Sequence, residues 1–166
     1  MTFNQKAEGF EMAASNDPWR EVVADWQGGT AFLAKNAAGG SVKVGAYEGE
    51  QRLSAMELLL TAMAGCTGAD VASILEKMRQ PVEQLKVTVR GKRADTHPKV
   101  YTEIEVSYIV WGDGVDLKSV DQAIQLSNNK YCSVTAMLKA VAEVKTAFQV
   151  LPVNQLSEPE QLAGQD

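Results

Sequence analysis

The chain has 166 residues, of which 45% are hydrophobic and 22% are charged. This length suits one main domain rather than two large ones, and the composition is that of an ordinary folded protein, neither disordered nor fibrous. The 16 basic and 21 acidic residues give a formal charge of −5. We therefore expect no general attraction to nucleic acid or to anionic membranes. One histidine and two cysteines cannot supply the four ligands of a structural zinc site.

The first part of the chain reads as a lead-in followed by short strands. Residues 1–18 have no basic start and apolar core of the kind found in a secretory signal, so a cytoplasmic location is expected. Three segments rich in Val, Leu, Phe and other aromatics follow, separated by glycine pairs, which predicts an antiparallel meander. The segments are Glu21 to Trp26, Thr30 to Lys35 and Ser41 to Tyr47.

A long helix is expected next, ending near Arg79 because Gln80 precedes a proline. Ser54 and Glu57 match a capping box at its start. Its apolar residues cover nearly the whole circumference, which indicates a helix buried at the centre of the fold. A membrane span is the less favoured interpretation, because Glu57, Asp70 and two threonines interrupt the apolar stretch.

The second half of the chain predicts a hairpin, two shorter helices and a final strand, from its apolar periodicity and capping residues. The expected elements are strands at Val82 to Ala94 and Val100 to Trp111, helices at Asp116 to Asn128 and Cys132 to Lys139, and a strand at Glu143 to Leu151. This order predicts an α+β fold with antiparallel sheets. Residues 19–151 would form its single domain and residues 152–166 a flexible tail.

The long apolar helix poses a packing problem for a monomer. It must be covered on every side, yet six strands and two short helices leave little to cover it. A homodimer that shares its core would solve this problem, so we expect one.

Each cysteine has a structural and a chemical interpretation. Cys66 lies inside the long helix, where a cysteine usually packs as a small apolar side chain. Cys132 lies at the expected start of a helix, where free N–H groups and the helix dipole lower a thiol pKa, so packing and chemistry are equally supported. In a reducing compartment, free thiols or a reversible redox pair are expected rather than a permanent disulfide. The two cysteines are 66 positions apart, and no spacing argument places them together.

Two motifs carry more information together than either cysteine does alone. In the stretch from Ala55 to Cys66, a Glu-Leu pair at Glu57 begins the helix and the cysteine follows nine residues later. The second motif is Tyr131-Cys132-Ser133-Val134, with Leu138-Lys139-Ala140 behind it. Over roughly residues 19–151, these motifs and the order of elements resemble the OsmC/Ohr family of osmotically inducible and organic-hydroperoxide-resistance proteins.

The resemblance implies a domain-swapped homodimer with its sites at the subunit interface, and a thiol peroxidase acting in oxidative or osmotic stress defence. Carried over, Cys66 matches the peroxidatic cysteine, Cys132 the resolving cysteine and Glu57 the acidic residue of the Glu-Leu motif. A thiolate would attack an organic hydroperoxide or hydrogen peroxide, and the resulting sulfenic acid would condense with the second thiol. A dithiol, typically a lipoylated protein, would then reduce the disulfide. No cofactor is implied.

The chain departs from the family at one position. The arginine that the family's peroxidases place near the cysteine falls here on Ala46. Cys66 lies too deep in its helix for the dipole to act strongly, so another cation must lower its pKa. Arg52 is the nearest candidate in sequence, although such an arginine is more often solvated. Asp70, one turn after Cys66, would oppose thiolate formation, so we expect it to face another element or solvent.

Other functions stay open. Ala46 favours a non-peroxidatic dimer that binds a small apolar or thiol-containing ligand at its interface, and a structural protein with packed cysteines is a third interpretation. Glu57 has an alternative role as the capping partner of Ser54. Two thiolates and carboxylates are possible metal ligands, but without a CxxC pair we expect no metal site.

Overall fold

The computed structural model describes residues 18–46, 49–50 and 52–155. The chain divides into two compact units, Met1–Met56 and Glu57–Asp166. The expected lead-in, except for its last residue, lies outside the described residues, as do Tyr47 and most of the expected tail. Within that tail the structure describes a short 3-10 turn at Val153–Gln155.

The first unit contains a three-stranded antiparallel meander, as the glycine-separated segments predict. Its strands are β1 (Val22–Gly28), β2 (Ala31–Asn36) and β3 (Ser41–Val44), in the order β1-β2-β3. Gly45 directly follows β3 with a φ of 85°, and a Cβ there would lie 2.1 Å from the Thr30 carbonyl oxygen. Only glycine permits this close approach.

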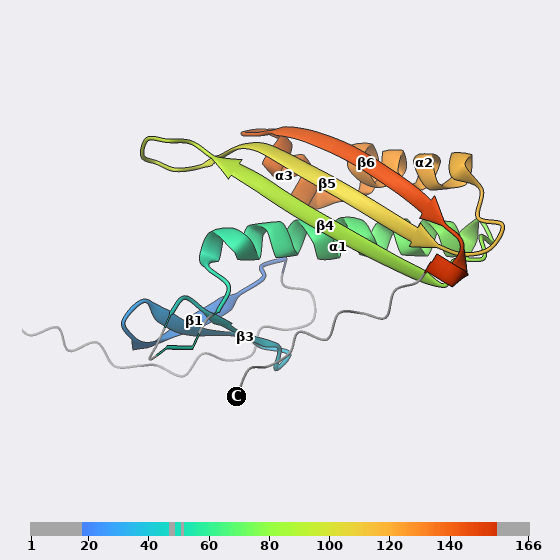
Figure 1. The fold of residues 1–166 in the computed structure, drawn as a ribbon. Coiled ribbons are helices and arrows are strands. Elements are labelled where there is room, and N and C mark those ends of the chain that lie inside the picture. The colour runs from blue at the N-terminus through green and yellow to red at the C-terminus, as the bar shows by residue number, and fades with distance from the viewer. Residues whose placement is uncertain (1–17, 47–48, 51, 156–166) are drawn as a thin grey trace, which may run out of the picture. The chain divides into compact units, whose positions relative to one another are not determined.

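The second unit is a three-stranded sheet covered by helices on one side (Figure 1). Its elements are α1 (Ala55–Lys77), β4 (Gln84–Arg93), β5 (Tyr101–Trp111), α2 (Leu117–Leu126), a π-helical turn at Ser127–Tyr131, α3 (Ser133–Lys139) and β6 (Glu143–Leu151). The sheet order is β4-β5-β6. Two sheets with helices confirm the expected α+β class.

The expectation of purely antiparallel sheets is wrong for the last strand. Strands β4 and β5 form the expected antiparallel hairpin, but β6 pairs parallel to β5, with Glu103 opposite Glu143 and Trp111 opposite Leu151. Parallel neighbours need a long crossover connection. Here α2, the π-helical turn and α3 form that crossover.

The core of the second unit lies between the sheet and α1. Alternate residues of β5 are buried, among them Ile104, Val106, Tyr108 and Val110. On α1 the buried residues recur at every fourth position: Met63, Thr67, Val71 and Leu75. A Cβ added at Gly68 would lie 3.2 Å from a methyl group of Val87 on β4, so the helix and the strand pack closely.

Helix α1 is less buried than its composition predicts. Only one stripe along it is buried, and Leu59 is 42% exposed. The prediction that α1 is buried on every side is therefore wrong for a single copy of the chain. By length and hydropathy α1 is also able to cross a membrane, with a mean hydropathy of 1.6. Its buried stripe packs on a sheet, however, as the core helix of a soluble domain does.

Candidate active site

The two cysteines meet in the second unit although 66 positions separate them. The Sγ atoms of Cys66 and Cys132 and a carboxylate oxygen of Asp70 all lie within 4.8 Å of one another. Cys66 and Asp70 share one face of α1 because residues four apart are neighbours on a helix. Both cysteines are free thiols, Cys66 half-buried and Cys132 buried. The structure therefore brings together the two sulfurs that the family resemblance pairs.

A π-helical turn positions Cys132. Helix α2 ends at Leu126, and residues Ser127–Tyr131 continue as a π-turn closed by the Cys132 N–H, which donates to the Ser127 carbonyl oxygen at 2.9 Å. Such turns insert one extra residue into a helix and are frequent at functional sites. Cys132 then adopts extended backbone and becomes the N-cap of α3.

The first turn of α3 donates hydrogen bonds to both sulfurs. The Thr135 N–H and hydroxyl donate to the Cys132 Sγ at 3.3 and 3.1 Å. The Val134 N–H donates to the Cys66 sulfur. N–H groups at a helix start have no partner within the helix, so they are available to hold these two side chains.

The surroundings of Cys66 favour its protonated form. Burial raises the pKa of the Cys66 thiol most, and the Cys132 sulfur raises it further. The Val134 N–H lowers this pKa, whereas the negative charge of Asp70 raises it. In the described part of the chain, no cation is among the groups that shift this pKa. The activating cation that the sequence calls for is therefore not found among them.

The Asp70 carboxylate is the end of a buried chain of hydrogen-bonded hydroxyl groups, which begins at Tyr108 and passes through Thr67 and Ser127. Ser127 Oγ donates to Asp70 Oδ2 at 2.9 Å, and a hydroxyl has one proton to give. The bond between Thr67 and Ser127, 2.9 Å long, must therefore have Thr67 as its donor. By the same reasoning, Tyr108 donates in its 2.5 Å bond to Thr67. The chain is thus polarised toward the carboxylate, and each bond strengthens the next.

Tyr108 is suited to begin this chain. Its side chain is 1% exposed, and burial raises the pKa of its phenol, as do Cys132 and Asp70. The net shift of this pKa is upward, with burial as its largest cause. A phenol with a raised pKa stays protonated and remains a donor, so the carboxylate is held by an ordered line of groups.

Among the other expected site residues, only Glu57 belongs to the same unit as the two sulfurs. Glu57 precedes Cys66 by nine residues on α1, about 13 Å along the helix axis. Its charge instead acts on Tyr101, where burial raises the phenol pKa, Arg93 lowers it and Glu57 raises it. Arg52 belongs to the first unit, where its guanidinium binds the Glu50 carboxylate.

Ala46 also belongs to the first unit. It follows β3, and its N–H donates to the Thr30 hydroxyl at 3.3 Å. Where the family's peroxidases have an arginine, this chain therefore has the short, exposed side chain of Ala46.

Asp70 faces another element, as expected, because it accepts from Ser127 of the π-helical turn, but it is not remote from Cys66. It lies beside both sulfurs rather than facing solvent, because the Ser127 hydroxyl holds it there. The i, i+4 spacing from Cys66 was a signal for this placement. Nothing in the sequence pattern marked Thr67, Ser127 and Tyr108 as its partners, since they come from three separate elements.

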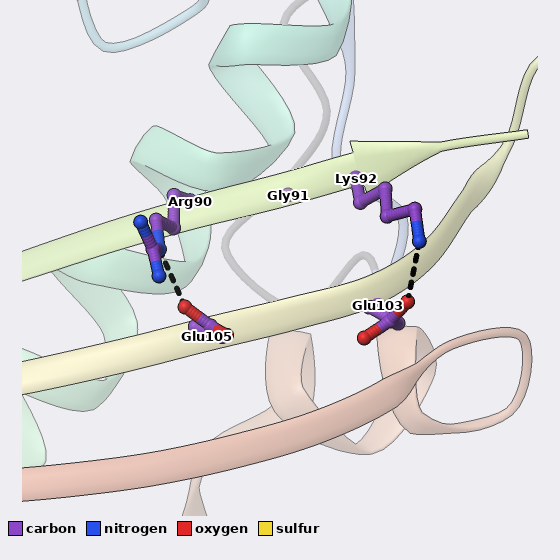
Figure 2. A pocket seen from close by; sticks show the side chains of 5 residues that line it. All are labelled: Arg90, Gly91, Lys92, Glu103 and Glu105. Carbon is purple, nitrogen blue, oxygen red and sulfur yellow. Dashed lines mark hydrogen bonds and ion pairs between the residues drawn. The ribbon is translucent and has the colours of Figure 1, made fainter.

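A hollow of about 290 Å³ on β4 and β5 is a different kind of feature. Figure 2 shows the side chains that line it, Arg90, Lys92, Glu103 and Glu105, paired across the two strands. Arg90 binds Glu105, and Lys92 binds Glu103 at 3.0 Å. Surface pairs of this kind contribute little to stability. With their charges matched, these groups form a solvated strand face rather than a reactive site.

The chain belongs to the OsmC-like protein family: its residues 48–147 match the family model described as OsmC-like protein. It is 34% identical over 126 residues to Protein YhfA of Escherichia coli K12, a match that covers 76% of this chain and 94% of that protein. A solved hypothetical protein from Aquifex aeolicus VF5 is 40% identical, with a TM-score of 0.74 over 81% of this chain and 97% of that one.

More distant structures share the fold. An organic hydroperoxide resistance protein from Elizabethkingia anophelis superposes with a TM-score of 0.63 at 13% identity, over 83% of this chain and 100% of that one. These findings confirm the family that the two cysteine motifs indicate.

Proposed function

We propose that this protein is a cysteine-based thiol peroxidase that reduces organic hydroperoxides or hydrogen peroxide in defence against peroxide stress. Family membership and the fold shared with structures named organic hydroperoxide resistance proteins support a role of this kind. The observation that carries the mechanism is the placement of the Cys66 and Cys132 sulfurs within 4.8 Å of each other. A disulfide needs about 2.05 Å between sulfurs, so small side-chain movements would close it.

The reaction would proceed in two steps. The Cys66 thiolate attacks one oxygen of the peroxide, the O–O bond breaks, and the departing oxygen takes a proton from water to leave as an alcohol, or as water when the substrate is hydrogen peroxide. The product is a Cys66 sulfenic acid. The Cys132 thiol then attacks the oxidised sulfur, forming the disulfide and releasing water. The Val134 N–H, already bonded to the Cys66 sulfur, is the group that would stabilise its charge.

Rapid mixing of the reduced, chelator-treated protein with cumene hydroperoxide tests this function. We expect one Cys66–Cys132 disulfide per chain, formed about a hundredfold faster per thiolate than with a free thiol, the effect of one well-placed hydrogen-bond donor. Because the pKa of Cys66 is raised, the thiolate fraction is small at neutral pH. The observed rate should therefore rise about tenfold per pH unit until the pH reaches that pKa. A rate per thiolate equal to that of N-acetylcysteine would refute the function and favour the ligand-binding dimer.

We propose Arg52 as the cation of the working site. Only 9% of its side-chain surface is exposed, and among the described residues its buried Nε has no hydrogen-bond partner, so a donor is available for a thiolate or a peroxide. The same pH series on Arg52→Met should then show the profile displaced to higher pH. Arg90→Met, an exposed arginine on β4, is the matched control. If the unmodified protein, Arg52→Met and Arg90→Met all give the same pH profile, Arg52 is not part of the site and Cys66 has no assigned cation.

A homodimer is proposed as the assembly. The apolar side chains of α1 outside its buried stripe, such as Leu59, would gain cover from a second copy. Sedimentation at micromolar concentration should give twice the chain mass of 18.0 kDa. A stable folded monomer at that concentration would exclude the shared core.

The disulfide must be reduced for a second turnover. We propose a dithiol reductant, such as a lipoylated protein, in a cytoplasmic setting that keeps both thiols free. A lipoylated domain is expected to support repeated peroxide consumption where glutathione supports one cycle. Equal turnover with both reductants would argue against this choice.

A further inference from the structure

Three groups that bind metal ions converge at the candidate site. The sulfurs of Cys66 and Cys132 and an oxygen of Asp70 lie within 4.8 Å of one another. Around a tetrahedral zinc ion, with Zn–S of about 2.3 Å and Zn–O of about 2.0–2.2 Å, ligand atoms lie about 3.5–3.8 Å apart. Shifts of about an ångström, within reach of side-chain rotation, would bring the three atoms to these separations.

The charge of the cluster also favours a cation. With both thiols ionised, three negative groups would lie together in a half-buried place, where repulsion between like charges is strong. A divalent ion offsets two of the three charges.

Each of the three ligand groups already has an orienting partner. Ser127 donates to Asp70 at 2.9 Å, Thr135 donates twice to Cys132, and the Val134 N–H donates to Cys66. Outer contacts of this kind fix the direction of metal ligands and are part of most metal sites. Because Ser127 is itself held by Thr67, the carboxylate is ordered from the core outward.

We propose that Cys66, Cys132 and Asp70 bind one Zn²⁺ ion, leaving a fourth position open to water or a small thiol. Two thiolates select a borderline or soft ion over Mg²⁺ and Ca²⁺. Each thiol gives its proton to solvent when the ion binds. The site needs no peroxidase activity, but it uses the same two sulfurs, so a zinc-bound chain is shielded from peroxide.

Metal titration of the reduced, chelator-treated full-length protein tests the site. Calorimetry should show one Zn²⁺ per chain, and Co²⁺ should give thiolate charge-transfer absorption together with the visible bands of a tetrahedral ion. Asp70→Asn should weaken Zn²⁺ binding by about 10- to 100-fold, whereas Asp121→Asn, an exposed residue of α2, should leave it unchanged. Cys66→Ser, at a half-exposed position, should weaken binding at least as much.

Any of three results would refute the zinc site. The first is saturation at a ratio other than one Zn²⁺ per chain, and the second is an unchanged Zn²⁺ affinity in Asp70→Asn. The third is unchanged Zn²⁺ binding after diamide has converted the two thiols into a disulfide. The readout is metal binding by the reduced protein. A slow reaction of the metal-free protein with peroxide would therefore refute the peroxidase function but not the zinc site. Failure to bind Zn²⁺ would refute the zinc site but not the peroxidase function.

Discussion

Replacing Cys66 by serine is expected to abolish peroxide consumption and disulfide formation. The serine hydroxyl is a poor nucleophile toward an O–O bond, whereas a thiolate attacks it readily. Stopped-flow measurement of cumene hydroperoxide loss, with mass spectrometry of the protein, should show unmodified chain at the end of the reaction. A Cys66→Ser variant that still consumes peroxide at the original rate would show that Cys132 or another group is the nucleophile.

Cys132→Ser is the matched control, because the variant keeps the attacking sulfur and loses only the resolving one. One equivalent of sulfenic acid should accumulate on Cys66 and be trapped by dimedone. Since the Cys132 sulfur raises the pKa of Cys66, its removal should lower that pKa and leave the first step as fast or faster near neutral pH. A first step as slow as in Cys66→Ser would contradict the assignment of the two roles.

Thr67→Val should cost about 1–3 kcal/mol of unfolding free energy, the usual effect of a buried polar group left without its partner. The substitution preserves shape but removes the acceptor of the Tyr108 hydroxyl and the donor to Ser127. All three side chains are buried, so water cannot replace the lost bonds. Urea denaturation followed by circular dichroism gives the measurement.

Two further variants distinguish the loss of these buried hydrogen bonds from the effect of a Thr→Val change on helix propensity. Thr61→Val lies on the same helix, with an exposed hydroxyl that donates to the Glu57 carbonyl oxygen at 3.0 Å, and should change stability by no more than about 0.5 kcal/mol. Adding Tyr108→Phe to Thr67→Val removes the stranded phenol and should recover part of the loss. Equal losses at Thr61 and Thr67 would mean that the hydroxyl chain contributes nothing to stability.

Local pattern predicted the elements closely. The capping role of Asp116 is confirmed, since its carboxylate accepts from the Ser119 N–H at 2.9 Å and α2 begins at the next residue. The final strand has the predicted bounds, Glu143–Leu151. Its pairing was not predictable in the same way, because alternation of side chains is the same in parallel and antiparallel strands.

The sequence by itself determined the elements and, through two spaced cysteine motifs, the family, because periodicity, caps and motif spacing are properties of the chain alone. Only the tertiary structure decided that Cys66 and Cys132 meet, that Asp70 joins them and that β6 runs parallel to β5. The first two depend on how α1 lies against the π-helical turn and the start of α3, and the third on the long crossover that connects β5 to β6. The tertiary structure also decided the hydroxyl chain, because Tyr108, Thr67 and Ser127 come from three elements. Since all three hydroxyl groups are buried, each requires a hydrogen-bond partner within the protein.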